Sequence, residues 1–175
     1  LAFVLGRDNP KVLIIGSAGG KDVMYSLFYN ASHIDAVEIN PLLNELVSNH
    51  MADYAGHLYS HPAVHVYTEN ARTFVDRTSE KYDIILTSNT ISNAAIASGA
   101  MSLAEDYVYT REAFRAYWSH LSDEGIIFLS RPSSYFPRFT ATIKEVMIEQ
   151  GVAIPKDHLF IMNGMYLFVS IIYTY

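Results

Sequence analysis

The sequence contains no cysteine and little positive charge. The absence of cysteine excludes disulfides, thiolate zinc sites and cysteine nucleophiles. Lys and Arg together number 12 against 18 Asp and Glu, the formal net charge is −6, and no basic run stands out. Because phosphate binding needs clustered Lys and Arg, we expect no nucleic-acid surface. Half of the residues are hydrophobic and only 17% are charged, which indicates a globular domain.

No targeting-peptide pattern is visible in residues 1–175, and we expect no unbroken apolar run in them that could span a membrane. Residues 159–175 are strongly apolar, but Asn163-Gly164 interrupts them. An Asn-Gly pair between two β-rich runs favours a hairpin with a type I′ turn, since both positions tolerate positive φ. The chain begins at Leu1 without a methionine, and both of its ends are apolar. We therefore expect residues 1–175 to be a single domain cut from a longer chain.

Short apolar runs alternate with helical patterns along the chain. The patterns predict strands at 12–16, 34–39, 63–68, 82–88 and 125–130, and helices at 21–30, 41–51, 70–78, 111–121 and 138–150. Pro41 suits a first helical turn, and Thr110 suits an N-cap. Apolar strands separated by helices are typical of a parallel sheet covered on both faces. We predict a Rossmann-like α/β domain, doubly wound, mostly parallel and three-layered, that ends in an antiparallel hairpin.

The richest glycine stretch, residues 11–22, reads KVLIIGSAGGKD. It follows a predicted strand and opens a predicted helix, which is where ligands bind in doubly wound sheets. Small residues let a ligand approach the backbone, and a helix N-terminus offers free N–H groups. Close packing of strand against helix is the alternative explanation of these glycines. The residues that we expect to bind a cofactor here are Gly16, Ser17, Ala18, Gly19, Gly20 and Asp22.

An acidic residue ends the second predicted strand. Glu38 follows the glycines by about 20 residues, the spacing at which a carboxylate accepts hydrogen bonds from ribose hydroxyls. The alternative is a solvated acid without a partner. Together with the glycine turn, Glu38 and the adjacent Ile39 predict a nucleoside site.

The glycine string indicates which nucleoside binds. Read from Gly16, the string is G-x-G-x-G with Ala18 at the middle glycine, which resembles the first motif of class I S-adenosylmethionine-dependent transferases. In that fold an acidic or amide side chain after the third strand contacts the adenine, a position that Glu69 and Asn70 occupy here. Helix capping by Asn70 is an equally good reading.

A closer resemblance rests on three blocks, VEINP, ENARTFVDRTSEKYDIILTS and SLAEDYVYTREAFRAYWSHLSDEGIIFLSR. Between Lys11 and Arg131 they resemble the spermidine synthase-like superfamily, especially bacterial members in which this domain is joined to membrane-spanning segments. The resemblance implies a Rossmann-like sheet that binds S-adenosylmethionine or its decarboxylated form, and aminopropyl transfer to putrescine or a related amine. It also implies a cytoplasmic location, with attachment of the parent chain at the inner face of a membrane as an option.

The chain departs from this family after the fourth strand. Aminopropyltransferases carry a D-[ST]-[ST]-D-P motif there, and Ser88 and Ile91 stand at its two aspartates. The family's N-terminal β-domain is also missing. An alkylammonium has a pKa of about 10, so it needs a carboxylate or base to become nucleophilic. Glu105 and Asp106, at the end of a long polar loop, are candidate replacements; exposed acids at a helix N-terminus are the alternative.

We therefore predict an S-adenosylmethionine- or decarboxylated S-adenosylmethionine-binding transferase that moves an aminopropyl or methyl group to an unknown small-molecule acceptor. A polyamine is one such acceptor, Ser88 is included among the cofactor-binding residues, and a homodimer is left open. The alternative is a non-catalytic nucleoside-binding sensor or regulatory domain, and a dehydrogenase comes third. The histidines fit no metal-ligand spacing, so we expect no metal site.

Overall fold

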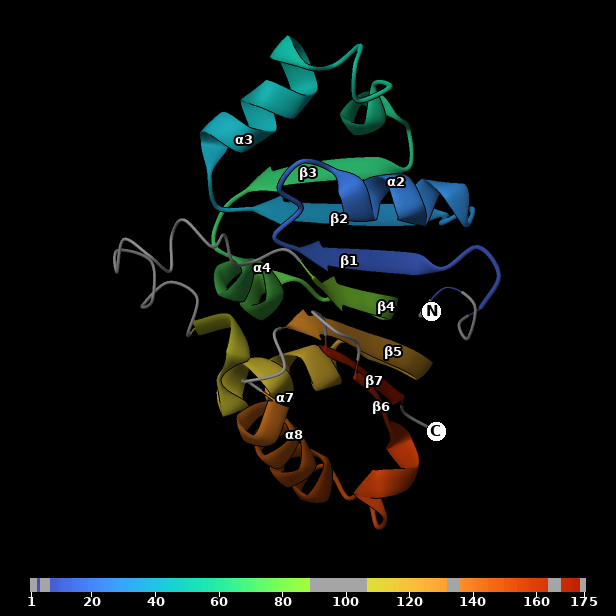
Figure 1. Ribbon diagram of the computed structural model, residues 1–175, viewed down its shortest axis with the longest axis vertical. Helices are drawn as coiled ribbons and strands as arrows, with labels where there is room; N and C mark the ends of the chain where they lie inside the picture. Colours follow the sequence, from blue (N-terminus) through green and yellow to red (C-terminus); the bar gives the residue numbers. More distant parts are fainter. Residues whose placement is uncertain (1–2, 4–6, 89–106, 132–135, 164–167, 174–175) are drawn as a thin grey trace.

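The structure, a computed structural model, describes residues 3, 7–88, 107–131, 136–163 and 168–173. Its centre is a seven-stranded sheet of order β3-β2-β1-β4-β5-β7-β6 (Figure 1). The strands are β1 Lys11–Ile15, β2 His33–Glu38, β3 Val64–Thr68, β4 Tyr82–Thr87, β5 Leu121–Arg131, β6 Leu159–Asn163 and β7 Phe168–Tyr173. Strands β1 to β5 pair in parallel, whereas β7 is antiparallel to both β5 and β6. The predicted fold class is confirmed.

Helices follow the parallel strands along the chain. They are α2 Lys21–Phe28, α3 Pro41–Glu45, α4 Ala71–Arg77, α7 Arg111–Ser119 and α8 Phe136–Glu149, with a π-helical turn η1 at Leu46–His50 and 3-10 turns η2 Leu58–Ser60, η3 Tyr107–Tyr109 and η5 Pro155–His158. Thr110 caps α7 as predicted, because its hydroxyl accepts the Ala113 N–H at 3.1 Å. Pro41 lies in the first turn of α3 as predicted.

Both faces of the sheet carry a hydrophobic core. On one face α4, α7 and α8 bury Phe74, Phe114 and Met147 against the strands. On the other face the core contains Val23 of α2 and Tyr59 of η2. The molecule therefore has three layers, with the sheet between two sets of helical segments (Figure 1).

Two local predictions are wrong. Asn163 lies within β6 and pairs with Phe168, so Asn163-Gly164 does not form the centre of a two-residue type I′ turn. Pairing of β6 with β7 extends to Asn163, and residues 164–167, between the strands, lie outside the described residues. The strand predicted from residue 125 begins at Leu121, because Leu121 already pairs with Tyr82 of β4.

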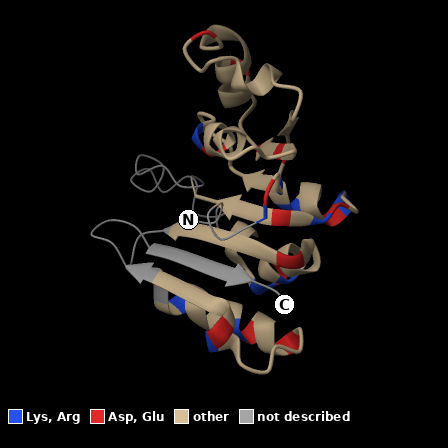
Figure 2. Cartoon of the chain, turned by 90° about the vertical axis from the view of Figure 1, so that its right-hand side faces the viewer, with Lys and Arg blue, Asp and Glu red and all other residues tan. Residues whose placement is uncertain are grey.

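Charged side chains of both signs are interspersed along the described elements rather than gathered on one of them (Figure 2). None of the helices in the described ranges is long and apolar enough to cross a membrane. The expected cytoplasmic location, membrane attachment of a parent chain, homodimer and single-domain boundaries stay predictions.

Candidate functional site

The small residues in the turn after β1 differ in backbone conformation and in the space around them. Gly16 and Gly20 have φ values of 75° and 82°, and Ala18 also has a positive φ of 44°. A Cβ added at Gly20 would lie 3.3 Å from Leu58 Cδ1, whereas one added at Gly19 would meet no atom of the described residues within 4 Å. Gly20 is therefore needed for backbone conformation and packing. Gly19 leaves the backbone open to an approaching ligand.

Glu38 is tied directly to this turn. Its side chain is buried, with Oε2 accepting the Ala18 N–H at 3.0 Å and Oε1 accepting the Asn40 N–H at 2.9 Å. The alternative of a solvated acid without a partner is thus wrong. Because a carboxylate has about four lone-pair positions, these two bonds leave acceptor capacity for a ribose diol.

Tyr59 is a residue of the candidate site that the sequence patterns did not reveal. Its hydroxyl oxygen lies 3.0 Å from Ser17 Oγ and 3.1 Å from the Ala18 carbonyl oxygen. Burial raises the pKa of Tyr59 above its ordinary value, so the phenol remains protonated and able to donate. It comes from η2, which carried no motif in the sequence. The two contacts of its hydroxyl hold the turn after β1 against η2.

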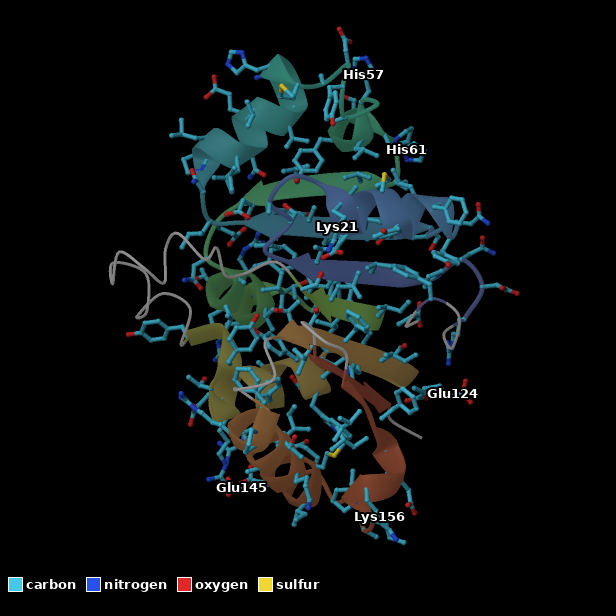
Figure 3. All side chains as sticks on the ribbon, viewed as in Figure 1. Lys21, His57, His61, Glu124, Glu145 and Lys156 are labelled. Atoms are coloured by element: carbon cyan, nitrogen blue, oxygen red, sulfur yellow. The ribbon has the colours of Figure 1, made fainter. Side chains whose placement is uncertain are left out.

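Asp22 and Ser88 meet across the ends of two elements. The Ser88 hydroxyl, just after β4, donates to Asp22 Oδ2 near the start of α2. Asp22 is only 6% exposed. The neighbouring Lys21 extends from the start of α2 in front of the sheet (Figure 3), with its Nζ 4.0 Å from Asp22 Oδ1. The fold thus brings together two residues that are distant in sequence and were both predicted to bind the cofactor.

A second buried contact lies at the same end of β4. Thr87 Oγ1 and the Tyr109 hydroxyl oxygen are 2.6 Å apart, and both residues are buried. This contact fixes the 3-10 turn η3 against the last residue of β4. It was not predictable from sequence, because the two residues flank the long polar loop.

The residues after β3 have partners within the chain. Asn70 caps α4 by accepting the Arg72 N–H at 2.8 Å, and the Glu69 carboxylate pairs with the Arg77 guanidinium. The capping reading of Asn70 is therefore confirmed, while adenine contacts by Glu69 and Asn70 stay predictions. Ile39 is 52% exposed. The predicted candidates Glu105 and Asp106, and Ile91, lie outside the described residues.

Other features do not compete with this site. Among the residues that the structure describes, no three His, Asp or Glu side chains are arranged to hold a metal ion. A cavity of about 490 Å³ lies away from the glycine turn, lined by Trp118 and residues 150–154, 157 and 158. It contains neither a strand end of the parallel sheet nor the glycine turn, so it does not fit a nucleoside site of this fold.

The chain is similar in sequence to known proteins. A family model described as the spermine/spermidine synthase domain matches residues 2–157. A curated polyamine aminopropyltransferase from Streptococcus pneumoniae is 26% identical over 156 residues, which make up 88% of this chain and 51% of that protein. One from Korarchaeum cryptofilum is 28% identical over 161 residues, 86% of this chain and 46% of that protein. The chain therefore spans about half the length of these curated relatives.

Solved structures share the fold. A spermidine synthase in complex with the transition state analogue AdoDATO aligns with a TM-score of 0.71 at 14% identity, covering 99% of this chain and 56% of that chain. At this identity the alignment shows the fold alone.

Proposed function

Because the chain belongs to the spermine/spermidine synthase domain family, we propose that it binds S-adenosylmethionine or its decarboxylated form and acts as an alkyltransferase. The observation that carries this proposal is the 3.0 Å hydrogen bond from the Ala18 N–H to Glu38. It sets a ribose-accepting carboxylate beside a turn whose backbone is open at Gly19. The residues present therefore fit a nucleoside of this class.

Such a nucleoside supplies an electrophilic carbon on its sulfonium, where an acceptor nitrogen forms a bond as the carbon–sulfur bond breaks and its electron pair stays on sulfur. The chain's own residues orient the reactants. Glu38 holds the ribose, and the hydrogen bonds of Tyr59 keep the turn in one conformation. Orientation of this kind accounts for a large part of catalysis in bimolecular reactions.

The acceptor that we propose is an amine of the polyamine type, with an aminopropyl group transferred. This finer assignment is supported by the names of the curated relatives, which are polyamine aminopropyltransferases. Methyl transfer to another small molecule is the other option at the same site.

A nucleoside-binding domain without chemistry is the second candidate function. One observation favours it: the residue directly after β4 is Ser88, which is neither an acid nor a base. A regulatory domain needs the Glu38 contact and the open Gly19 but needs no proton acceptor near the reacting carbon.

Two measurements test the proposal. In calorimetry, methylthioadenosine and decarboxylated S-adenosylmethionine should both bind more tightly than NAD, and Glu38→Gln should weaken both more than the exposed control Glu80→Gln. If NAD bound more tightly than methylthioadenosine and decarboxylated S-adenosylmethionine, the proposal that the site binds S-adenosylmethionine-type nucleosides would be contradicted. Release of methylthioadenosine from decarboxylated S-adenosylmethionine should then be followed chromatographically with putrescine, spermidine and other amines. Binding of the nucleoside without release of methylthioadenosine, whichever amine is added, would support the regulatory function instead.

A further inference from the structure

A cavity lies apart from the nucleoside site, where the last turn of α7, the residues after α8 and the turn η5 come together. These segments occupy the lower part of Figure 1, away from the turn after β1. The cavity has a volume of about 490 Å³, within the usual size of small-molecule sites. The described residues that line it are Trp118, residues 150–154, Asp157 and His158.

The cavity combines an indole with a carboxylate. Trp118 is half-buried and packs against the hydrophobic core, so its side chain is held in place. Asp157 is exposed and supplies a formal negative charge. Both groups attract cations, the carboxylate by its charge and the indole by the negative face of its ring. No Lys or Arg is among the described residues that line the cavity, so these two groups favour a positively charged ligand.

The basic residues nearby do not fill this role. Arg111 and Arg115 of α7 both pair with the Glu149 carboxylate at the end of α8. Lys156, next to Asp157 in η5, is exposed and does not line the cavity. His158 has other contacts within the chain, and we assign it no role.

The rest of the lining indicates an organic cation rather than a metal ion. Val152 packs against the hydrophobic core, and Ile154 is 50% exposed beside it. These apolar side chains suit the hydrocarbon part of a ligand. A metal ion needs several oxygen or nitrogen ligands, and the part of the chain that the structure describes contains no group of three His, Asp or Glu side chains arranged to hold one.

We propose that this cavity binds a compact alkylammonium ion. Asp157 and the indole of Trp118 contact the ammonium group, and Val152 and Ile154 contact its hydrocarbon part. Primary ammonium groups of diamines and quaternary ammonium groups share this chemistry. The inference is separate from the proposed function, because the cavity contains neither the glycine turn nor the end of a parallel strand.

Trp118 is the single tryptophan of the chain, so its fluorescence reports on the cavity. Putrescine and choline are titrated separately into the 175-residue chain, with sodium chloride at equal ionic strength as the reference. We expect a saturable change with a Kd of about 1 mM or lower. A change with putrescine alone assigns the site to primary ammonium groups, and a change with choline alone assigns it to quaternary ones. The absence of a saturable change with both probes would overturn the inference.

Uncharged probes of the same shape test whether the charge is recognised. Butane-1,4-diol replaces the ammonium groups of putrescine by hydroxyls, and 3,3-dimethylbutan-1-ol replaces the nitrogen of choline by carbon. We expect each to bind at least about tenfold more weakly than its charged counterpart, because it gains no attraction from Asp157 or the indole. Equal binding of the charged and uncharged probes would overturn the inference.

Two variants locate the ligand in the cavity. Asp157→Asn removes the charge with little change in shape, and affinity should fall about threefold or more, since water screens an exposed carboxylate. The matched control is Asp53→Asn, whose side chain is 99% exposed and whose affinity should stay within about twofold of the unmodified chain. Ala153→Phe, at an exposed position of the lining, fills the cavity and should abolish binding. Equal affinities of the two Asp→Asn variants, or undiminished affinity of Ala153→Phe, would place the ligand elsewhere and overturn the inference.

Discussion

Glu38 at the end of β2 accepts a hydrogen bond from the Ala18 N–H in the turn after β1, with 3.0 Å between nitrogen and Oε2. Its second oxygen accepts the Asn40 N–H at 2.9 Å, directly before α3. One buried carboxylate therefore orders both loops that border the nucleoside site. The residue that we expect to bind ribose is also the residue that shapes the backbone around it.

Replacing Glu38 should therefore affect stability and binding together. Glu38→Ala leaves the Ala18 and Asn40 N–H groups without this acceptor, and we expect it to lower the free energy of unfolding by about 1–3 kcal/mol. Affinity for methylthioadenosine should fall at least about tenfold. Urea denaturation and calorimetry measure the two effects. Loss of stability with unchanged affinity would show that Glu38 is purely structural.

The two adjacent glycines should respond differently to substitution. Gly20→Ala places a side chain at φ +82° and 3.3 Å from Leu58 Cδ1, so we expect it to be destabilising by about 1 kcal/mol or more. The methyl group of Gly19→Ala meets no atom in the part of the chain that the structure describes, so this variant should leave stability within about 0.5 kcal/mol. Affinity for methylthioadenosine should nevertheless fall in Gly19→Ala and further in Gly19→Val. Undiminished affinity in Gly19→Val would place the ligand elsewhere.

The strands and helix starts that frame the candidate site could be predicted because their signals are local. The apolar runs that form β1 and β2 are short and bounded by turn residues, and the spacing from the glycines to Glu38 reflects one βαβ unit. The cap at Thr110 and the first turn at Pro41 likewise depend on residues within a single helical turn.

The remaining contacts depend on tertiary structure and left no local pattern. Tyr59 reaches Ser17 across 42 positions, and Ser88 reaches Asp22 across 66. Asn163 pairs with Phe168 of β7 instead of occupying a two-residue turn, because register depends on the side-chain pattern along both strands. The prediction of a two-residue turn is wrong because it considers only the Asn163-Gly164 dipeptide and not the pairing of the strands around it.

Tyr59→Phe tests whether the turn must be held in place for binding. The substitution removes the hydroxyl near Ser17 Oγ and the Ala18 carbonyl and keeps the ring in the core. We expect a loss of about 0.5–1.5 kcal/mol in unfolding free energy, and a similar additional loss in binding of methylthioadenosine because the free turn must be reordered. The matched control is Tyr54→Phe, since Tyr54 is 87% exposed. Affinity equal to that of the control would contradict a role for Tyr59 in the site.

The buried carboxylate of Asp35 in β2 contacts polar groups of two neighbouring side chains, Tyr82 and His33. The Tyr82 hydroxyl donates to Asp35 Oδ2 at 2.7 Å, and His33 Nε2 lies 2.9 Å from Asp35 Oδ1. Burial, followed by the hydrogen bond and charge of Asp35, raises the pKa of Tyr82 well above its ordinary value of 10.0. Burial likewise raises the pKa of Tyr117.

These raised pKa values predict a loss of stability in alkali. Below about pH 10 the folded and unfolded chains both keep these tyrosine protons, so the stabilisation is fully present. Above that pH the unfolded chain releases them while the folded chain retains them, so the free energy of unfolding falls as pH rises. Urea denaturation between about pH 8 and pH 11 measures this fall. Tyr82→Phe should be less stable at pH 8, because Asp35 loses a donor, and should show a shallower fall above pH 10 than the Tyr54→Phe control. An equally steep fall in both variants would show that Tyr82 does not stay protonated in the folded chain.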